Sequence, residues 1–270
     1  MPIRLIALDL DGTLLDGGKG VPAENRAALQ AAVEGGATVV LASGRMTPSI
    51  APYADVLGID VMILGYNGAR VVGTAAEGRP VLVDVPLPSS CADEVIDYHE
   101  ANGVQLNYYL DDMLYSRDDD SMRPMAELYV GRTRSPITYV ESLQRFKGND
   151  PTKLILMAEE PERNRLHDEF LPTLDGRAKL IKTDPEYLEF LNVDIDKGVA
   201  LNMLCDTLGI PIEESMACGD GDNDAEMIAA AGVGVAMANA SEKSLAAADY
   251  VTTHDHNAAG VAEAVHKFVL

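Results

Sequence analysis

The apolar positions near the start of the chain fall into short runs separated by a helix-like segment. Residues 4–10 and 37–43 are apolar runs typical of strands, and residues 22–34 between them are typical of a helix with Pro22 near its beginning. Apolar strands that alternate with a helix are typical of parallel pairing in a sheet covered on both faces. This part of the chain therefore predicts a parallel α/β sheet.

The same alternation returns after residue 190. A helix is expected near 197–208, and the elements after it follow the same pattern: an apolar run into ACGD, the helix NDAEMIAAA, the strand GVGVAM, the helix SEKSLAAA and the short strand YVT. Such alternation predicts an open, Rossmann-like parallel sheet of the α/β class, with helices on both sides.

The middle of the chain, from about residue 84 to residue 190, has a different pattern. Its expected elements are, in order, the strand VLVDV, the helix CADEVIDYHEAN, the strands VQLNYYL and MLYS, a helix, the strand KLILMA, the helix ERNRLHDEFL and the strands AKLIKT and YLEFLNV. Adjacent short strands with aromatic residues favour an antiparallel α+β sheet. We therefore expect a core in two parts, residues 1–84 and 191–270, and an inserted α+β module over residues 85–190.

The composition is that of a globular chain. Of its 270 residues, 47% are hydrophobic, and no apolar run approaches the roughly 18–20 residues of a membrane span. The N-terminus lacks the basic and apolar regions of a signal peptide, so a cytoplasmic location is expected. The three cysteines are widely spaced and odd in number, which predicts reduced thiols rather than a disulfide framework.

The charge of the chain limits its partners. A formal net charge of −22 argues against a nucleic-acid-binding face, since such faces rely on Lys and Arg to neutralise phosphates. A small anionic substrate is still compatible, because a divalent cation with one Arg and one Lys supplies a local positive focus. We expect a small-molecule substrate, no nucleic acid, no membrane, and a monomer or weak homodimer.

Polar residues follow the strands of the predicted core at the edge where ligands of such sheets collect. The first strand ends at Asp9 and Asp11, the next ends at Ser43, and the run SMACG ends at Asp220, while Lys197 opens a helix. Clustered carboxylates stay ionised together only when a cation joins them, and oxygen ligands suit Mg²⁺. The residues therefore predict a Mg²⁺ site that includes Asp9 and Asp220.

The surrounding residues suit phosphoryl transfer. Arg45 and Lys197 add cationic contacts and Ser43 adds a hydroxyl group. Glycine-rich turns near Gly12, Gly44 and Gly219 expose backbone N–H groups. A carboxylate can attack phosphorus to form an aspartyl-phosphate, and a second carboxyl group, such as that of Asp11, can protonate the leaving oxygen and later deprotonate water.

These residues resemble the motifs of a known family. DLDGTLLD at 9–16 resembles the first motif of the haloacid dehalogenase (HAD) superfamily, SGR at 43–45 the second, Lys197 in DKG the third, and GDGDND at 219–224 the fourth. The inserted module is positioned as in Cof-type phosphatases with a C2B cap, which are similar to bacterial sugar phosphatases. The resemblance implies a HAD core with this cap and hydrolysis of small phosphorylated metabolites.

The resemblance also assigns roles to individual residues. It implies that Asp9 is the nucleophile and a Mg²⁺ ligand, that Asp11 is the general acid and base and gives its backbone carbonyl to the metal, and that Asp220 is the third ligand. The residues implied in phosphate binding are Leu10 through its backbone, Ser43, Gly44, Arg45, Lys197 and Asn223. Asp224 resembles the auxiliary acidic residue of the fourth motif. Asn67 and Asn239 occupy positions where the Cof-type pattern also has Asn, and whether these two side chains lie near the substrate stays open.

Several residues also have a structural interpretation. Asp196 stands where many relatives are uncharged, and we favour a helix cap over an effect on the site. GDGDND has the Asp spacing of a calcium loop, but Ala225 and Ala231 replace the Gly and Glu that such a loop needs. His254 and His256 have no third partner at helical spacing, so we expect a solvated loop there.

The leading hypothesis is a Mg²⁺-dependent phosphatase for sugar phosphates, whose inserted module closes over the site and reads the leaving group, with Tyr108, Tyr109 and Tyr115 as candidates. A phosphomutase of the phosphomannomutase type is the alternative. It needs a second phosphate site, for which the basic residues of the module are too scattered to decide: Arg117, Arg123, Arg132, Arg134 and Lys182. A non-catalytic phospho-switch is disfavoured by the large insertion.

Overall fold

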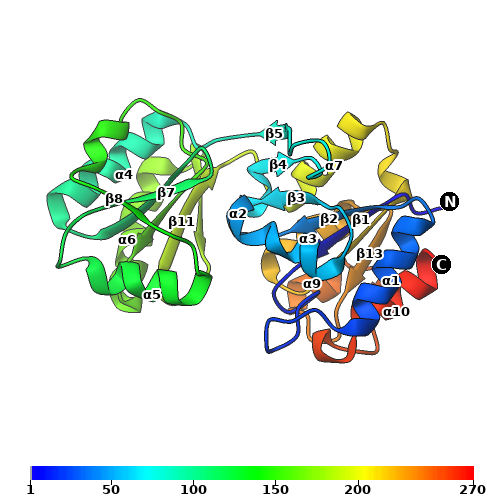
Figure 1. Cartoon of the computed structure of the whole chain (residues 1–270). Coiled ribbons are helices and arrows are strands. Elements are labelled where there is room, and N and C mark those ends of the chain that lie inside the picture. Colours follow the sequence, from blue (N-terminus) through cyan, green and yellow to red (C-terminus); the bar gives the residue numbers. More distant parts are fainter. Residues whose placement is uncertain (1) are drawn as a thin grey trace. The chain divides into compact units, whose positions relative to one another are not determined.

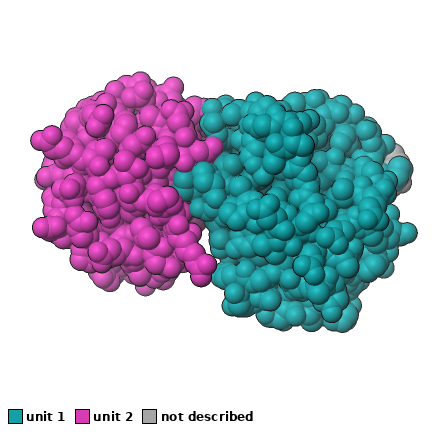
Figure 2. Space-filling view, viewed as in Figure 1, with its two compact units in different colours: residues 1–84, 196–270 teal, residues 85–195 magenta. Residues whose placement is uncertain are grey.

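The computed structural model describes residues 2–270, and these form two compact units. Unit 1 comprises the described residues up to Asp84 together with Asp196–Leu270, and unit 2 is Val85–Ile195 (Figure 2). The second core segment was expected to start at residue 191, but that residue lies inside the last strand of unit 2. The second boundary lies at Ile195, shortly after that strand ends at Asn192.

Unit 1 is built on one eight-stranded sheet in the order β14-β13-β12-β1-β2-β3-β4-β5. Its strands are β1 (Leu5–Asp9), β2 (Thr38–Ala42), β3 (Met62–Gly65), β4 (Arg70–Val72), β5 (Val81–Asp84), β12 (Ser215–Gly219), β13 (Val233–Ala236) and β14 (Tyr250–Val251). The strands from β14 to β3 pair in parallel, and only β4 and β5 at one edge are antiparallel. The parallel α/β core expected from the sequence is confirmed.

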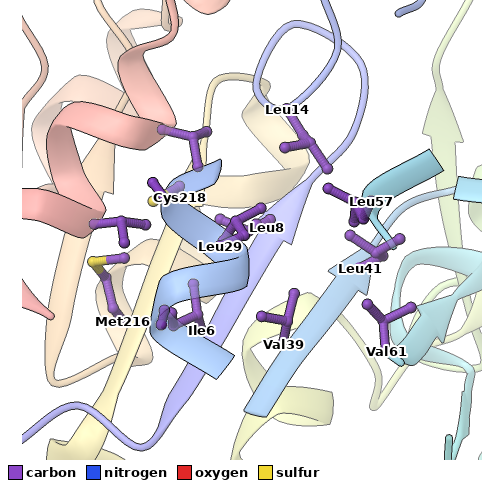
Figure 3. Packing of buried hydrophobic residues seen from close by; sticks show 14 of the residues in the cluster. Ile6, Leu8, Leu14, Leu29, Val39, Leu41, Leu57, Val61, Met216 and Cys218 are labelled. Carbon is purple, nitrogen blue, oxygen red and sulfur yellow. The ribbon is translucent and has the colours of Figure 1, made fainter. Parts of the chain in front are cut away.

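Helices of unit 1 follow most of the parallel strands (Figure 1). They are α1 (Ala23–Glu34), α2 (Thr47–Ile50), α3 (Pro52–Leu57), α7 (Lys197–Leu208), α8 (Ala225–Ala230), α9 (Glu242–Ala247) and α10 (Gly260–Phe268). Alternate side chains of β1, Ile6 and Leu8, pack in one apolar cluster with Leu29 of α1 and Met216 of β12 (Figure 3). Each such buried side chain contributes roughly 1.5–3 kcal/mol to folding, so this face fixes the strands whose ends carry the polar residues.

Unit 2 has a six-stranded sheet in the order β10-β11-β9-β6-β7-β8. Its strands are β6 (Gln105–Leu110), β7 (Met113–Arg117), β8 (Thr138–Val140), β9 (Lys153–Met157), β10 (Ala178–Lys182) and β11 (Tyr187–Asn192), and its helices are α4 (Ser89–Asn102), α5 (Arg123–Thr133) and α6 (Glu160–Leu174). All strand pairings are antiparallel except β7–β8. The expected α+β architecture is thus present, with one parallel pair that the sequence did not indicate.

The strand VLVDV was grouped with the elements in the middle of the chain. In the structure β5 pairs with β4 at the edge of the unit 1 sheet, which agrees with the expected core bounds of residues 1–84. Of the tyrosines that were candidates for reading a substrate, Tyr108 and Tyr109 are buried, whereas Tyr115 is half-buried. The ring centroids of Tyr108 and Tyr115 lie 4.9 and 4.7 Å from that of Phe146. Aromatic residues on a strand face beneath helices bury apolar area, and that packing decides their position here.

Candidate active site

Strand register brings the distant polar residues of unit 1 to one edge of the sheet. Leu8 of β1 pairs with Cys218 of β12, and Asp9 pairs with Ala42 of β2. The residues that follow β2 and β12, Ser43 and Asp220, therefore lie on either side of the end of β1. This edge is where parallel sheets collect ligands, as the sequence predicted.

The segment after β1 turns sharply and is held by burial. Leu10, Leu14 and Leu15 are fully buried, and the Leu15 N–H donates to the Leu10 carbonyl over 2.9 Å. Gly12 has a φ of +87°, and a Cβ atom there would collide with the Asp220 carboxylate. Glycine is required at this position both by the backbone conformation and by the close approach of Asp220.

Three carboxylates gather at the ends of β1 and β12. Asp9, Asp220 and Asp224 each offer one oxygen, and these oxygens lie within 4.8 Å of one another. The Lys197 ammonium donates to Asp9 Oδ1 and to Asp224 Oδ1, both over 2.6 Å. Lys197 is 0% exposed and Asp9 6% exposed, so this charge network is buried.

Burial and mutual repulsion shape the acidity of this cluster. Burial raises the pKa of Asp9 well above its ordinary value, the charge of Asp224 raises it further, and Lys197 opposes both. Burial also raises the pKa of Asp220, with the Thr13 hydroxyl opposing and the Asp224 charge adding to the rise. Burial alone would lower the pKa of Lys197, but the charges of Asp224 and Asp9 raise it overall.

The donor set fits a hard divalent cation. Three buried or half-buried carboxylates gather here, but the Lys197 ammonium contacts only those of Asp9 and Asp224, so the negative charge exceeds the positive charge next to it. A further cation relieves the repulsion that raises the pKa of Asp9, and ligands that are all oxygen suit Mg²⁺. Asp9 and Asp220 are the predicted ligands that the structure brings together here.

Local hydrogen bonds fix the positions of these charged groups. Asp224 Oδ2 accepts from the backbone N–H groups of Asp220 and Gly221, and the Thr13 hydroxyl donates to Asp220 Oδ1. Asp196 caps α7, because its carboxylate accepts from the N–H groups at the start of that helix. The cap preferred from the sequence is confirmed, and it sets Lys197 as the first residue of the helix.

Asp11 has different partners from Asp9. Arg45 holds its carboxylate with Nε to Oδ2 at 2.8 Å and Nη2 to Oδ1 at 2.6 Å, and Lys19 Nζ lies 2.6 Å from Oδ1. Partial burial by itself would raise the pKa of Asp11, but the bond from Lys19 and the charge of Arg45 lower it overall. Two carboxylates one residue apart in sequence thus have opposite electrostatic surroundings.

The SGR segment lies next to Asn67 and Asn223. Ser43 is buried, and its carbonyl accepts from the Asn67 N–H over 3.0 Å. Asn67 has a left-handed φ of 55°. Its side-chain oxygen accepts a hydrogen bond from the Asn223 amide over 2.9 Å. The same oxygen would lie 3.1 Å from a Cβ atom on Gly44, so Gly44 has little room for a side chain. Asn67, whose proximity to the site the sequence left open, thus lies beside Ser43, Gly44 and Asn223, three of the residues predicted to bind phosphate.

Asn239 lies on the Asp220 side of the site. Its amide donates to the Gly12 carbonyl over 2.9 Å, and its side-chain oxygen accepts from the His256 N–H over 3.1 Å. The loop with His254 and His256 was expected to be solvated. His254 is indeed exposed to solvent there, with its Nδ1 2.7 Å from Glu263. The backbone of His256 supports Asn239.

Sequence reasoning missed two residues of this region. Thr13 lies within the quoted motif, and a hydroxyl next to a turn glycine could have indicated its bond to Asp220. Lys19 gave no signal, because a lysine in a glycine-rich loop is ordinarily a solvated charge. The calcium-loop alternative receives no support, since Asp222 is exposed while Asp220 and Asp224 turn toward Thr13 and Lys197.

Comparison with known proteins agrees with this geometry. The family model described as haloacid dehalogenase-like hydrolase matches residues 6–265. YxeH of Bacillus subtilis, which is named as a phosphatase, is 31% identical over 99% of this chain and 98% of its own length. The 5-amino-6-(5-phospho-D-ribitylamino)uracil phosphatase YwtE of the same organism is 28% identical over 82% of each chain. The crystal structure of a haloacid dehalogenase-like hydrolase from Bacteroides thetaiotaomicron is 30% identical, with a TM-score of 0.88 over 98% of this chain and 99% of that one.

The chain therefore belongs to the haloacid dehalogenase-like hydrolase family. Within it, the phosphatase names of its relatives place the chain among the phosphoric monoester hydrolases that act on small phosphorylated metabolites. Among residues 2–270, none of the helices has the length and apolar content to cross a bilayer.

Proposed function

We propose that the chain is a Mg²⁺-dependent phosphatase that moves the phosphoryl group of a sugar phosphate first to Asp9 and then to water. The observation that carries the proposal is the excess of negative charge at Asp9, Asp220 and Asp224, which Lys197 only partly balances. Such a site fits a divalent cation and an anionic substrate together better than it fits either alone.

Asp9, Asp220 and the backbone carbonyl of Asp11 are the proposed ligands, with Asp224 beside them. When bound there, Mg²⁺ supplies positive charge to the phosphoryl oxygens and holds them in place. The proposed role of Asp224 is to orient the Asp220 backbone and Lys197, which is supported by its carboxylate accepting hydrogen bonds from both. We assign the phosphate contacts to the Leu10 backbone and to Ser43, Gly44, Arg45, Lys197 and Asn223.

In the proposed reaction the Asp9 carboxylate attacks phosphorus and the bond to the leaving oxygen breaks. Asp11 gives its proton to that oxygen, which leaves as an alcohol. Water then attacks the aspartyl-phosphate, Asp11 takes a proton from it, and phosphate is released. Lys197 already contacts the Asp9 carboxylate over 2.6 Å, so one cation can hold the nucleophile and then the charge that develops on the phosphoryl group.

The sugar-phosphate preference is supported by the name of YwtE, whose printed substrate carries its phosphate on a ribityl chain. Reading of the leaving group by unit 2 is part of the proposal. The half-buried Tyr115 stays a candidate for it, whereas Tyr108 and Tyr109 are buried and not available. A cytoplasmic location and a monomeric or weakly dimeric state stay predictions from the sequence.

A phosphate-release screen tests this function. Sugar phosphates, nucleotides, flavin mononucleotide and pyridoxal phosphate are compared with and without Mg²⁺, for the wild type and for Asp9→Asn. EDTA and Asp9→Asn are each expected to abolish release, and sugar phosphates are expected to be the best substrates. Asp222→Asn is the matched control, since this exposed aspartate in the same loop as Asp220 has no proposed role. Retention of most activity by Asp9→Asn contradicts the proposed nucleophile, and an isomerised sugar phosphate without free phosphate indicates a phosphomutase instead.

A further inference from the structure

The turn that follows β3 has an unusual backbone. Tyr66, Asn67 and Gly68 have φ values of 53°, 55° and 105°, so three consecutive residues have a positive φ. Glycine adopts such values freely and asparagine more readily than most residues, whereas a bulky side chain such as that of tyrosine rarely does. A strained backbone of this kind persists only where its surroundings hold it, and it is concentrated at functional sites.

The turn is fixed to two elements of the site. The Tyr66 N–H donates to the Arg45 carbonyl over 3.0 Å. The next N–H, that of Asn67, donates to the Ser43 carbonyl over the same distance. On the other side, a Cβ atom on Gly68 would lie 2.5 Å from the backbone oxygen of the residue that caps α7. The turn is therefore held both by the SGR segment and by the start of α7.

The Asn67 side chain points toward residues that are predicted to bind phosphate. It is only 5% exposed, and its Oδ1 accepts a hydrogen bond from the Asn223 amide over 2.9 Å. Its Nδ2 would lie 3.2 Å from a Cβ atom on Gly44, so this nitrogen lies close to the Gly44 backbone. Among residues 2–270, none accepts a hydrogen bond from this Nδ2 group. The oxygen of the amide is thus satisfied within the protein, and its two N–H groups are not.

The backbone of the turn does not by itself account for an asparagine here. Glycine fits a φ of 55° without strain, and aspartate tolerates it about as well as asparagine does. A carboxylate at this position would also accept the hydrogen bond from Asn223. What asparagine adds is a pair of N–H donors. Buried polar groups of folded proteins almost always have a partner, so these donors indicate the oxygen of a ligand.

We propose that Asn67 is a catalytic residue, whose Nδ2 group donates a hydrogen bond to an oxygen of the phosphoryl group while that group is transferred. This inference rests on the proposed function, because it requires a phosphoryl group beside Gly44 and Asn223. The bonds that form and break are those of the proposed reaction, in which the Asp9 oxygen bonds to phosphorus and the leaving oxygen departs. The amide of Asn67 transfers no proton.

The strained turn gives this donor its catalytic value. A donor that is fixed in advance, at the place where charge develops, stabilises the transition state without having to reorient during the reaction. Two backbone hydrogen bonds and the contact with α7 fix the turn, and the bond from Asn223 fixes the plane of the Asn67 amide. The direction of the Nδ2 group is therefore set before substrate binds.

Two substitutions of Asn67 remove the donor and keep the turn. Asn67→Gly retains the left-handed backbone and removes the whole side chain. Asn67→Asp also retains an acceptor for Asn223, but it replaces the donors by a negative charge. The variants are compared with the wild type for kcat/KM on a sugar phosphate, and for the Kd of inorganic phosphate, which calorimetry measures on the Mg²⁺-loaded protein.

Both measurements are expected to report the lost donor. For Asn67→Gly, kcat/KM is expected to fall roughly 10- to 100-fold, the size expected when a hydrogen bond to a charged group is lost, and the Kd of phosphate is expected to rise at least about fivefold. Asn67→Asp is expected to lose at least as much on both measurements, because its carboxylate also repels the phosphoryl oxygens.

A double variant distinguishes a direct contact from an effect through Asn223. If Asn67 only oriented Asn223, Asn67→Gly would change nothing once Asn223→Ala had removed that side chain. A direct hydrogen bond from Asn67 to the phosphoryl group predicts a further loss of kcat/KM, at least about fivefold, in the Asn223→Ala background.

Asn202→Asp is the matched control for the added charge. Asn202 is an exposed residue of α7, and its amide donates to the Gly198 carbonyl over 3.0 Å. Its substitution is expected to leave kcat/KM and the Kd of phosphate unchanged. Melting curves accompany the assays, and the Asn67 variants are expected to melt close to the wild type, because neither glycine nor aspartate strains the turn.

The outcomes separate this inference from the function on which it rests. Wild-type kcat/KM and phosphate binding in Asn67→Gly, or no further loss in the double variant, overturn the catalytic role of Asn67. If Asp9→Asn is inactive at the same time, the proposed phosphatase mechanism stands without Asn67. If Asp9→Asn remains active, the proposed function itself fails.

Discussion

Each unit of the chain buries one lysine against carboxylate, but the balance of charge differs. In unit 2, Lys153 pairs with a single carboxylate, Glu189, over 3.1 Å, and both side chains are under 10% exposed. The Thr183 hydroxyl donates to the other oxygen of Glu189, and the Lys153 ammonium lies 5.3 Å from the centre of the Tyr109 ring. In unit 1, Lys197 forms ion pairs with two carboxylates, those of Asp9 and Asp224, and the carboxylate of Asp220 lies beside them.

The comparison distinguishes a structural pair from a reaction site. A buried pair of equal and opposite charges that is fully hydrogen-bonded needs nothing further, although removing one member leaves a buried charge alone. A cluster with excess negative charge is incomplete until a cation and its ligands arrive. The same residue types therefore have different functions, which the local charge balance decides.

The largest expected effect comes from Asp9→Asn in the unbalanced cluster. The change removes the proposed nucleophile and is expected to lower phosphate release by at least about 10³-fold. It also removes one of the mutually repelling carboxylates, so the unfolding midpoint without Mg²⁺ is expected to stay the same or rise. Activity assays together with urea unfolding measure both. If Asp9→Asn lowered the free energy of unfolding as well as the activity, Asp9 would have a structural role, like the one expected for Lys153.

For the balanced pair of Lys153 and Glu189 we expect the opposite result, a loss of stability when one charge is removed. Lys153→Met leaves Glu189 buried and unpaired, so the free energy of unfolding is expected to fall by about 3–5 kcal/mol. The double variant Lys153→Met with Glu189→Leu removes both charges and is expected to recover most of that loss. Urea unfolding of the two variants is the measurement. The pair would not be purely structural if the double variant were as unstable as the single one.

Mg²⁺ is expected to stabilise the chain through the cluster of Asp9, Asp220 and Asp224, and not through the pair of Lys153 and Glu189. At 100 times its Kd, a ligand that binds only the folded state adds roughly 2.7 kcal/mol to the free energy of unfolding. Melting curves with Mg²⁺ or EDTA should show a shift for the wild type and for Lys153→Met, and little or none for Asp220→Asn. An undiminished shift in Asp220→Asn would contradict the assignment of Asp220 as a ligand.

The smallest expected effect concerns Glu263, a half-buried carboxylate that accepts hydrogen bonds from Thr253, Tyr250 and His254. Partial burial would raise its pKa, but the Thr253 N–H, the Tyr250 hydroxyl and His254 lower it to about 2. A lowered carboxylate pKa stabilises the fold above the unfolded value of 4.5, and this stability is lost as the pH falls from there toward 2. Water screens the group, so we expect a loss of only about 1 kcal/mol.

Urea unfolding midpoints at pH 7 and pH 3 measure this loss. Glu263→Gln is expected to make the midpoint less dependent on pH, while Glu24→Gln, at an exposed carboxylate of α1, is expected to leave the dependence unchanged. An unaltered pH dependence in Glu263→Gln would show that this carboxylate gains nothing from its hydrogen bonds.

The sequence predicted most of the core because its signals are local. Apolar runs defined β1, β2 and β12, and Asp196 before Lys197 marked the start of α7 correctly. The edge strand β5 was grouped with the elements of the middle of the chain although the expected core bounds include it, since an isolated apolar run does not tell which sheet it joins. Strands β3 and β4 were missed, because they are short and lie between turns.

The site was predictable only in part. The motifs named the carboxylates, and the strand register places Asp9, Ser43 and Asp220 at one edge. Their pairings depend on tertiary contacts that no spacing reveals. Lys197 forms a hydrogen bond with Asp9. Lys19 reaches Asp11 from a loop in which Lys19 itself has a left-handed φ.

The central claim is that Asp9 takes the phosphoryl group before water does. The most direct measurement is the stereochemical course of hydrolysis, with a monoester made chiral at phosphorus by sulfur and oxygen isotopes. Each in-line displacement inverts the configuration at phosphorus, so transfer to Asp9 followed by attack of water predicts overall retention. Overall inversion would mean that water attacks the substrate directly, and it would contradict the account.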